Sequence, residues 1–131
     1  MDKWWDYVWV AAGSALGGVS RHWMSGFIAQ RVGERFPFGT LCVNLVGSFI
    51  IGLLAAFTVP EGRLFLGRSS RLFLMVGILG GYTTFSSFSL QTLNLARDGE
   101  WLAAALNVGG SVALCLGGVW LGHLLGQAIN R

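Results

Sequence analysis

The chain has 131 residues, of which 53% are hydrophobic and only 11% are charged. Ordinary soluble domains carry roughly 25% charged residues, so this composition excludes a soluble domain and indicates a protein that resides in membrane lipid. The formal net charge of +3 is too small a surplus to indicate nucleic-acid binding.

Four apolar stretches follow one another along the chain, separated by short segments rich in charged residues, glycine and proline. A bilayer core about 30 Å thick needs roughly 20 apolar residues per helical span, and each stretch is about that long. We therefore predict an all-α integral membrane protein, a single transmembrane domain over residues 1–131. Its four helices are expected at about 4–29, 41–59, 72–96 and 101–128.

The distribution of Lys and Arg gives little preference for one orientation in the membrane. With four spans both termini share a side, and the two sides then carry nearly equal numbers of basic residues. One side has Lys3, Arg63, Arg68, Arg71 and Arg131, and the other has Arg21, Arg31, Arg35 and Arg97. We infer insertion in both orientations and pairing as an antiparallel homodimer, because four small helices could hardly enclose a pathway alone.

Polar residues inside the spans recur at helical spacing. The sets are Asn44, Ser48 and Gly52; Thr84, Ser87, Gln91 and Asn94; and Asn107, Ser111 and Cys115. Each set lies on one helix face, and polar groups within a membrane face either a partner helix or a wet cavity. Three such faces favour a pathway for a small ion, while hydrogen bonding between helices is the alternative for any single residue.

The third stretch contains a signal for an interrupted helix. Gly80 and Gly81 precede two threonines, and the paired glycines together with these two β-branched cap formers are expected to break the helix near residues 80–84. A break frees backbone oxygens for a cation and begins a half-helix whose positive end favours an anion. Phe85 and Phe88, three residues apart, would turn ring edges to one side, although a plain aromatic packing pair is the alternative.

The interiors of the four stretches contain no Asp, Glu or Lys. A proton-coupled transporter normally uses a carboxylate within the membrane, and these stretches offer none. A small four-helix, dual-topology transporter of the multidrug type is therefore only the alternative hypothesis. The sequence has no Ser, His and Asp grouping within the membrane and no glycine-rich phosphate loop, so nothing in it indicates an enzyme.

Two motifs resemble those of the Fluc (CrcB-type) fluoride channels of bacteria. They are the segment 37–49, PFGTLCVNLVGSF, and the segment 80–89, GGYTTFSSFS, and the similarity extends over essentially the whole chain. The resemblance implies passive efflux of fluoride and so fluoride resistance, through an antiparallel dual-topology homodimer in the inner membrane. It also implies a structural Na⁺ at the centre of the dimer.

The resemblance further implies roles for particular residues. Asn44 would donate its amide to fluoride, and Phe85 and Phe88 would line the pore with ring edges. Further fluoride contacts are expected from the hydroxyl groups of Thr40, Thr84, Ser87 and Ser111, and Na⁺ would bind the backbone carbonyls of Gly80 and Thr83. Gln91, Asn107 and Cys115 depart from the family's usual residues, so their roles stay open.

Overall fold

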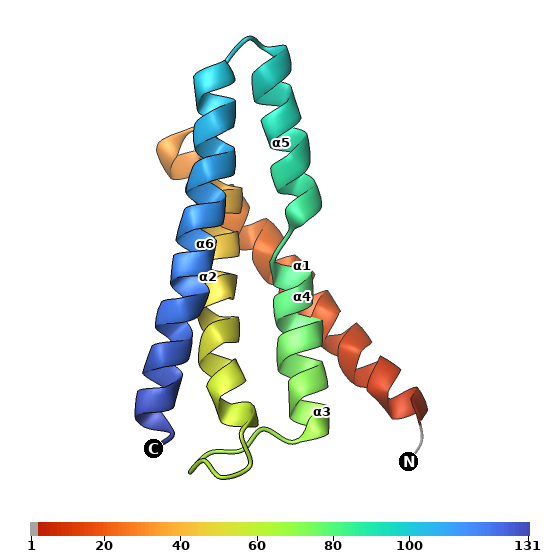
Figure 1. Ribbon diagram of the computed structural model, residues 1–131. Coiled ribbons are helices and arrows are strands. Elements are labelled where there is room, and N and C mark those ends of the chain that lie inside the picture. The colour runs from red at the N-terminus through yellow and green to blue at the C-terminus, as the bar shows by residue number, and fades with distance from the viewer. Residues whose placement is uncertain (1–2) are drawn as a thin grey trace.

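The computed structural model describes residues 3–131, and every regular element in that range is a helix (Figure 1). In chain order the elements are α1 (Lys3–Val32), α2 (Phe38–Ala55), η1 (Ala56–Thr58), α3 (Arg68–Arg71), η2 (Leu72–Leu79), α4 (Gly80–Tyr82), α5 (Phe85–Arg97) and α6 (Trp101–Ile129). The stretch from α3 to α5 is one interrupted helix, and η2 within it is wound as a π-helix. The chain therefore forms four long helical segments.

Three of these segments are long and apolar enough to cross a membrane. They are Phe38–Thr58, Arg68–Arg97 and Trp101–Ile129, with mean hydropathies of 2.1, 1.3 and 1.8. The α1 helix, with 30 residues, is long enough but is not among them. Its Asp6, Arg21 and Arg31 make it the most polar of the four. On length and composition the described residues thus supply three spans where the sequence predicted four.

Polar contacts hold together one end of the bundle. The C-terminus, the start of α1 and the loop between η1 and α3 lie at one end, and the α5–α6 turn lies at the other (Figure 1). At the first end, Arg68 forms an ion pair with Asp6. Asn130 closes the same end, because its Oδ1 accepts a hydrogen bond of 2.6 Å from the Leu64 amide and its Nδ2 donates to the Ala56 carbonyl at 2.9 Å.

Small residues allow the helices to approach closely. The α2 and α6 helices run side by side, and a Cβ added at Gly122 would overlap the Phe49 carbonyl oxygen on α2. A Cβ at Gly126 would lie 2.6 Å from the Leu53 carbonyl oxygen. Backbones this close gain dispersion contacts that larger residues would prevent. The glycine spacing in α6 therefore fixes how α2 and α6 cross.

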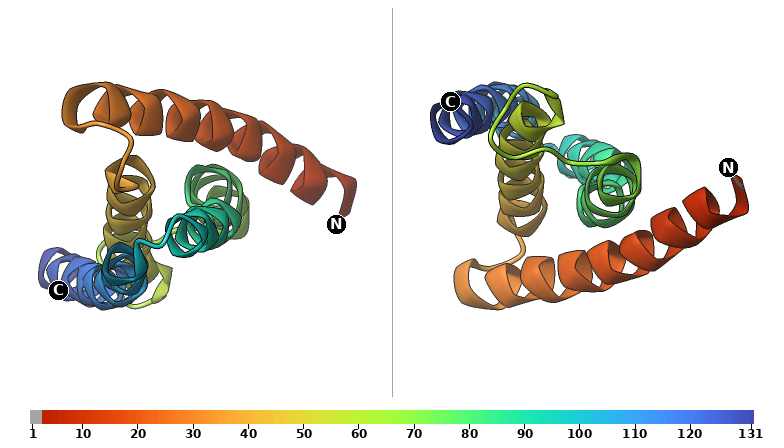
Figure 2. Two further views of the ribbon diagram at one scale, coloured as in Figure 1. Left: turned by 90° about the horizontal axis from the view of Figure 1, so that it is seen from above. Right: turned by 90° about the horizontal axis from the view of Figure 1, so that it is seen from below.

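The α1 helix crosses the interrupted helix obliquely, as both axial views show (Figure 2). Gly13 and Gly77 form this crossing, and a Cβ at Gly77 would lie 2.9 Å from the Gly13 Cα. A Cβ at Gly81 would lie 2.5 Å from the Ser14 carbonyl oxygen. Gly81 is thus required for packing against α1.

The interruption falls after the paired glycines. Gly80 and Gly81 are helical in α4, whereas Thr83 (φ −84°, ψ 156°) and Thr84 (φ −151°, ψ 117°) are extended. The predicted break near residues 80–84 is therefore confirmed, but it falls on the two threonines that were expected as cap formers and not on the paired glycines. Two physical reasons account for this: the lack of a Cβ at Gly81 serves the contact with α1, and Thr84 has the extended backbone of a residue that caps a new helix.

Candidate functional site

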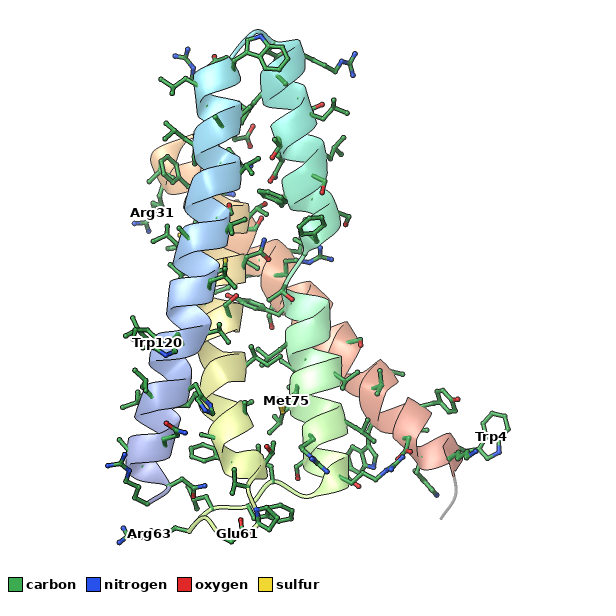
Figure 3. The ribbon with its side chains drawn as sticks, viewed as in Figure 1. Trp4, Arg31, Glu61, Arg63, Met75 and Trp120 are labelled. Atoms are coloured by element: carbon green, nitrogen blue, oxygen red, sulfur yellow. The ribbon has the colours of Figure 1, made fainter. Side chains whose placement is uncertain are left out.

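A groove of about 410 Å³ opens at the break in the third helix. Its walls come from α2, from the segments on both sides of the break, and from α6. It brings together seven of the nine residues predicted for the site, namely Asn44, Gly80, Thr83, Thr84, Phe85, Phe88 and Ser111. Met75, whose side chain points from η2 toward α2 in Figure 3, lines the lower part. Every residue that lines this groove is formally uncharged.

Asn44 braces the break through both atoms of its amide. Its Nδ2 donates to the Thr84 carbonyl oxygen at 3.0 Å, and its Oδ1 accepts from the Thr84 amide at 2.7 Å. An interrupted helix in lipid needs partners for the backbone groups that lose their helical bonds. Asn44 supplies these partners from the neighbouring helix, so its side chain holds the break in place and also faces the groove.

Thr84 begins the second half-helix. Its Oγ1 accepts a hydrogen bond from the Ser87 amide at 3.2 Å, which is the bond expected of a helix N-cap. The Ser87 hydroxyl lies 3.1 Å from the same oxygen. Thr84 and Ser87 therefore order the start of α5, and the free backbone amides of this first turn create a region of positive potential.

The break also leaves a carbonyl oxygen without its helical donor. In a continuous helix the Thr84 amide would donate to the Gly80 carbonyl, but here it donates to Asn44. Gly80 and Thr83 both line the groove. Hard cations such as Na⁺ prefer oxygen ligands, so carbonyls released at a helix break fit the donor set that such an ion requires.

The two phenylalanines occupy different environments. Their ring centroids lie 5.2 Å apart with an interplanar angle of 47°. Phe88 is 9% exposed, whereas Phe85 is 77% exposed on the open side of the groove. Exposing such a ring to water would be costly. The cost is avoided when lipid or a second chain covers the ring. Both residues line the groove beside the break.

Ser111 and Asn107 connect the groove to the α5–α6 contact. The Asn107 Nδ2 donates to Thr92 Oγ1 at 2.9 Å, and the Ser111 hydroxyl lies 3.4 Å from Asn107 Oδ1. Asn107 is only 2% exposed. Its amide therefore joins α5 to α6. Hydrogen bonding between helices was the alternative to a pathway role for the residues of this polar stripe. Cys115, from the same stripe, lines the groove.

Thr40 and Ser87 do not line the groove. Thr40 lies in a second, polar chamber of about 440 Å³ between the α1–α2 loop and the α5–α6 turn, together with Gln91 and Asn94. The Gln91 Oε1 is buried and has no hydrogen-bond partner among the described residues. The stripe Thr84, Ser87, Gln91 and Asn94 thus runs along α5 from the groove to this chamber.

The sequence reasoning missed two functional features of this region. It assigned Asn44 a role toward an ion but not the bracing of Thr84, and it did not predict the pairing of Arg35 with Glu100 beside the chamber. Asn44 and Thr84 are 40 residues apart, and Arg35 and Glu100 are 65 apart. Spacing along the chain carries no signal for contacts of that range.

The fold and the groove together define a class of protein. Helices long and apolar enough to span a membrane surround an uncharged groove lined by an amide, hydroxyl groups, aromatic rings and free backbone oxygens. Such donors replace part of an ion's hydration shell without holding the ion tightly. The chain has the architecture of a membrane protein with an ion pathway.

Comparison with known proteins identifies the family. Residues 8–123 match the family model described as CrcB-like protein, Camphor Resistance (CrcB), and the chain belongs to this family. It is 59% identical over 124 residues to a fluoride-specific ion channel FluC of Opitutus terrae, covering 95% of this chain and 94% of that protein. Proteins of the same name from Methylocella silvestris and Paramagnetospirillum magneticum are 54% and 58% identical over 126 and 125 residues. These two alignments cover 96% and 95% of this chain, and 96% and 98% of the relatives.

Proposed function

We propose that this protein is a fluoride-selective ion channel that lets fluoride leave the cell passively, and that it is not an enzyme. The observation that carries the proposal is the uncharged groove at the helix break, where Asn44, Ser111 and the two phenylalanines converge. Three relatives that are 54–59% identical over nearly their whole length bear the name fluoride-specific ion channel. The family and the chemistry of the groove therefore support the same substrate.

Fluoride suits this set of donors. It is a small anion with a strongly held hydration shell, so it enters a protein only where hydrogen-bond donors replace the lost water. Asn44 uses one of its two amide protons on Thr84, and the other is free to bind fluoride. Thr40, Thr84, Ser87 and Ser111 add hydroxyl groups along the route. Phe85 and Phe88 add the positive edges of their rings.

The second hypothesis, a multidrug-type transporter, is not favoured. Proton coupling needs a carboxylate inside the membrane, and no Asp or Glu lines the groove. The named relatives are fluoride channels, which also favours passive conduction.

The channel is completed by a second copy of the chain in antiparallel orientation. The exposed Phe85 ring and the open side of the groove would then face the partner and be shielded from lipid. The nearly equal basic residues on the two sides support insertion in both orientations. In this assembly α1 is the fourth span. Its 30 residues make a helix about 45 Å long, which can cross a core of about 30 Å at a tilt.

Na⁺ is the cofactor that best fits the break. The carbonyl oxygens of Gly80 and Thr83 would hold it at the centre of the dimer, where two breaks meet. The ion would fix the two copies to each other and supply positive charge near the pathway. A bacterial inner membrane is the proposed location, and the inside-negative potential there would drive fluoride outward.

The test is ion efflux from liposomes that contain the purified protein, measured with electrodes for fluoride and chloride. We expect rapid release of fluoride and negligible release of chloride. Asn44→Asp and Phe85→Ile should abolish fluoride release. Trp120→Phe is the control, because Trp120 is 64% exposed and points away from the bundle in Figure 3. Chloride release equal to fluoride release, or no fluoride release from folded protein, would refute the proposal.

A further inference from the structure

The polar chamber lies where an ion would enter or leave the groove. It is bounded by the end of α1, the α1–α2 loop, the start of α2, the end of α5 and the start of α6. Thr40 lies one helical turn before Asn44 on α2, and Gln91 lies one turn after Ser87 on α5. The chamber therefore continues the polar face of the groove to the surface at this end of the bundle.

The chamber has an unfavourable charge for an anion. Its charged lining residues are Glu34, Asp98 and Glu100, which are negative at neutral pH, and Arg35, which is positive. These four residues give a formal charge of −2. The guanidinium of Arg31 does not contribute to the lining, because it lies 4.7 Å from the centroid of the Phe27 ring. Among the residues that line the chamber, Arg35 alone is a cation.

Arg35 is held at the chamber by one carboxylate. Its Nε and Nη2 atoms both donate to Glu100 Oε1, at 3.1 Å and 2.9 Å. The Glu100 side chain is 34% exposed and that of Arg35 is 86% exposed. The pair joins the α1–α2 loop to the start of α6. It places the guanidinium beside the carboxylate that is most enclosed at the entrance.

We propose that Arg35 sets the rate of anion entry by neutralising Glu100 at the mouth of the chamber. This inference rests on the proposed function, since it concerns how fluoride reaches the groove. An entering anion meets the potential of the whole mouth, and each formal charge within a few ångströms changes its local concentration. Arg35 is thus an entry residue, distinct from the groove residues that bind the ion.

The proposal predicts opposite effects for the two partners of one ion pair. Arg35→Gln changes the formal charge of the mouth from −2 to −3, and Glu100→Gln changes it to −1. A unit charge about 5–10 Å from the ion in a water-like medium changes its local concentration about two- to fourfold. We expect Arg35→Gln to lower the fluoride current by about this factor and Glu100→Gln to raise it. The double variant returns the mouth to −2 and should conduct like the wild type.

The experiment is single-channel recording in planar bilayers at fluoride concentrations below saturation, with an impermeant salt setting the ionic strength. The effects should be full at about 0.01 M ionic strength and nearly absent at about 1 M, where the screening length is about 3 Å. Arg31→Gln removes an equal charge from the same end but outside the lining of the chamber, so it is the matched control and should lower the current less than Arg35→Gln does. An exposed ion pair contributes about 0–1 kcal/mol to stability, so the variants are expected to fold.

A merely structural role for the pair gives a different result. Both single variants break the same bridge, so if it only fastens the loop to α6, they change the current in the same direction and independently of salt. That outcome, or no change in either variant, overturns the inference while the wild type still conducts fluoride. A wild-type protein that conducts no fluoride instead refutes the proposed function, and the two failures are thereby distinguished.

Discussion

Replacing Asn44 by alanine tests whether the break in the third helix depends on a side chain from its neighbour. The substitution removes the donor to the Thr84 carbonyl and the acceptor of the Thr84 amide, at 3.0 Å and 2.7 Å. Thr84 is only 9% exposed, so water reaches its backbone poorly. The variant therefore loses two hydrogen bonds and leaves two backbone groups without partners.

The expected loss of stability follows from these groups. Hydrogen bonds between membrane helices average about 0.6 kcal/mol, and a buried polar group left unpaired costs about 1–3 kcal/mol. The groove beside Thr84 has room for water, which limits the cost. We therefore expect Asn44→Ala to destabilise the folded protein by about 2–4 kcal/mol and to abolish fluoride conduction.

The measurement is unfolding in mixed micelles of increasing SDS content, followed by tryptophan fluorescence, together with fluoride efflux from liposomes. Ser48→Ala is the matched control, because Ser48 lies one turn further along α2 in the same groove and its side chain makes no hydrogen bond within residues 3–131. It should unfold like the wild type. If Asn44→Ala also unfolds like the wild type but loses conduction, Asn44 acts on the ion alone and the bracing role is refuted.

Three further substitutions test the fold around the groove. Gly122→Val should prevent α2 and α6 from packing and so abolish folded protein on size-exclusion chromatography, whereas Gly117→Ala, which meets open space, should be neutral or slightly stabilising. Asn107→Leu removes the bond to Thr92 and should cost about 1–2 kcal/mol in SDS unfolding while fluoride selectivity over chloride is retained. Thr84→Val removes the N-cap of α5 and should cost about 1 kcal/mol, which Thr84→Ser should largely restore.

Much of the architecture could be predicted because a membrane places strong demands on local composition. Apolar stretches of about 20 residues, broken by charged turns, predict helices whatever their neighbours are, and the expected ranges differ from the observed elements by only a few residues at each end. The stripe around Ser111 was likewise visible at helical spacing. For Asn107 the structure decided the open alternative in favour of a helix-to-helix bond.

The details of the break could not be predicted, because they depend on contacts between distant segments. Gly80 and Gly81 have low helix propensity, which suggested that they end the helix. In the structure both glycines are helical, and Gly81 allows α1 to pack closely because it has no Cβ. Its contact partner, Ser14, is remote in sequence, so the sequence carried no signal for this contact. The extended conformation falls instead on Thr84, where Asn44 and the Ser87 amide supply the required hydrogen bonds.

The same amide that keeps the helix broken also faces the ion pathway, and this couples assembly of the site to its chemistry. Were the Thr84 amide to return to the Gly80 carbonyl, the helix would close, the carbonyl oxygen would be consumed, and the positive end of α5 would disappear. Asn44 prevents this without introducing a charge that would hold an anion too tightly. A neutral side chain with one donor and one acceptor is therefore suited to both tasks, which an aspartate, lacking the donor when ionised, could not perform.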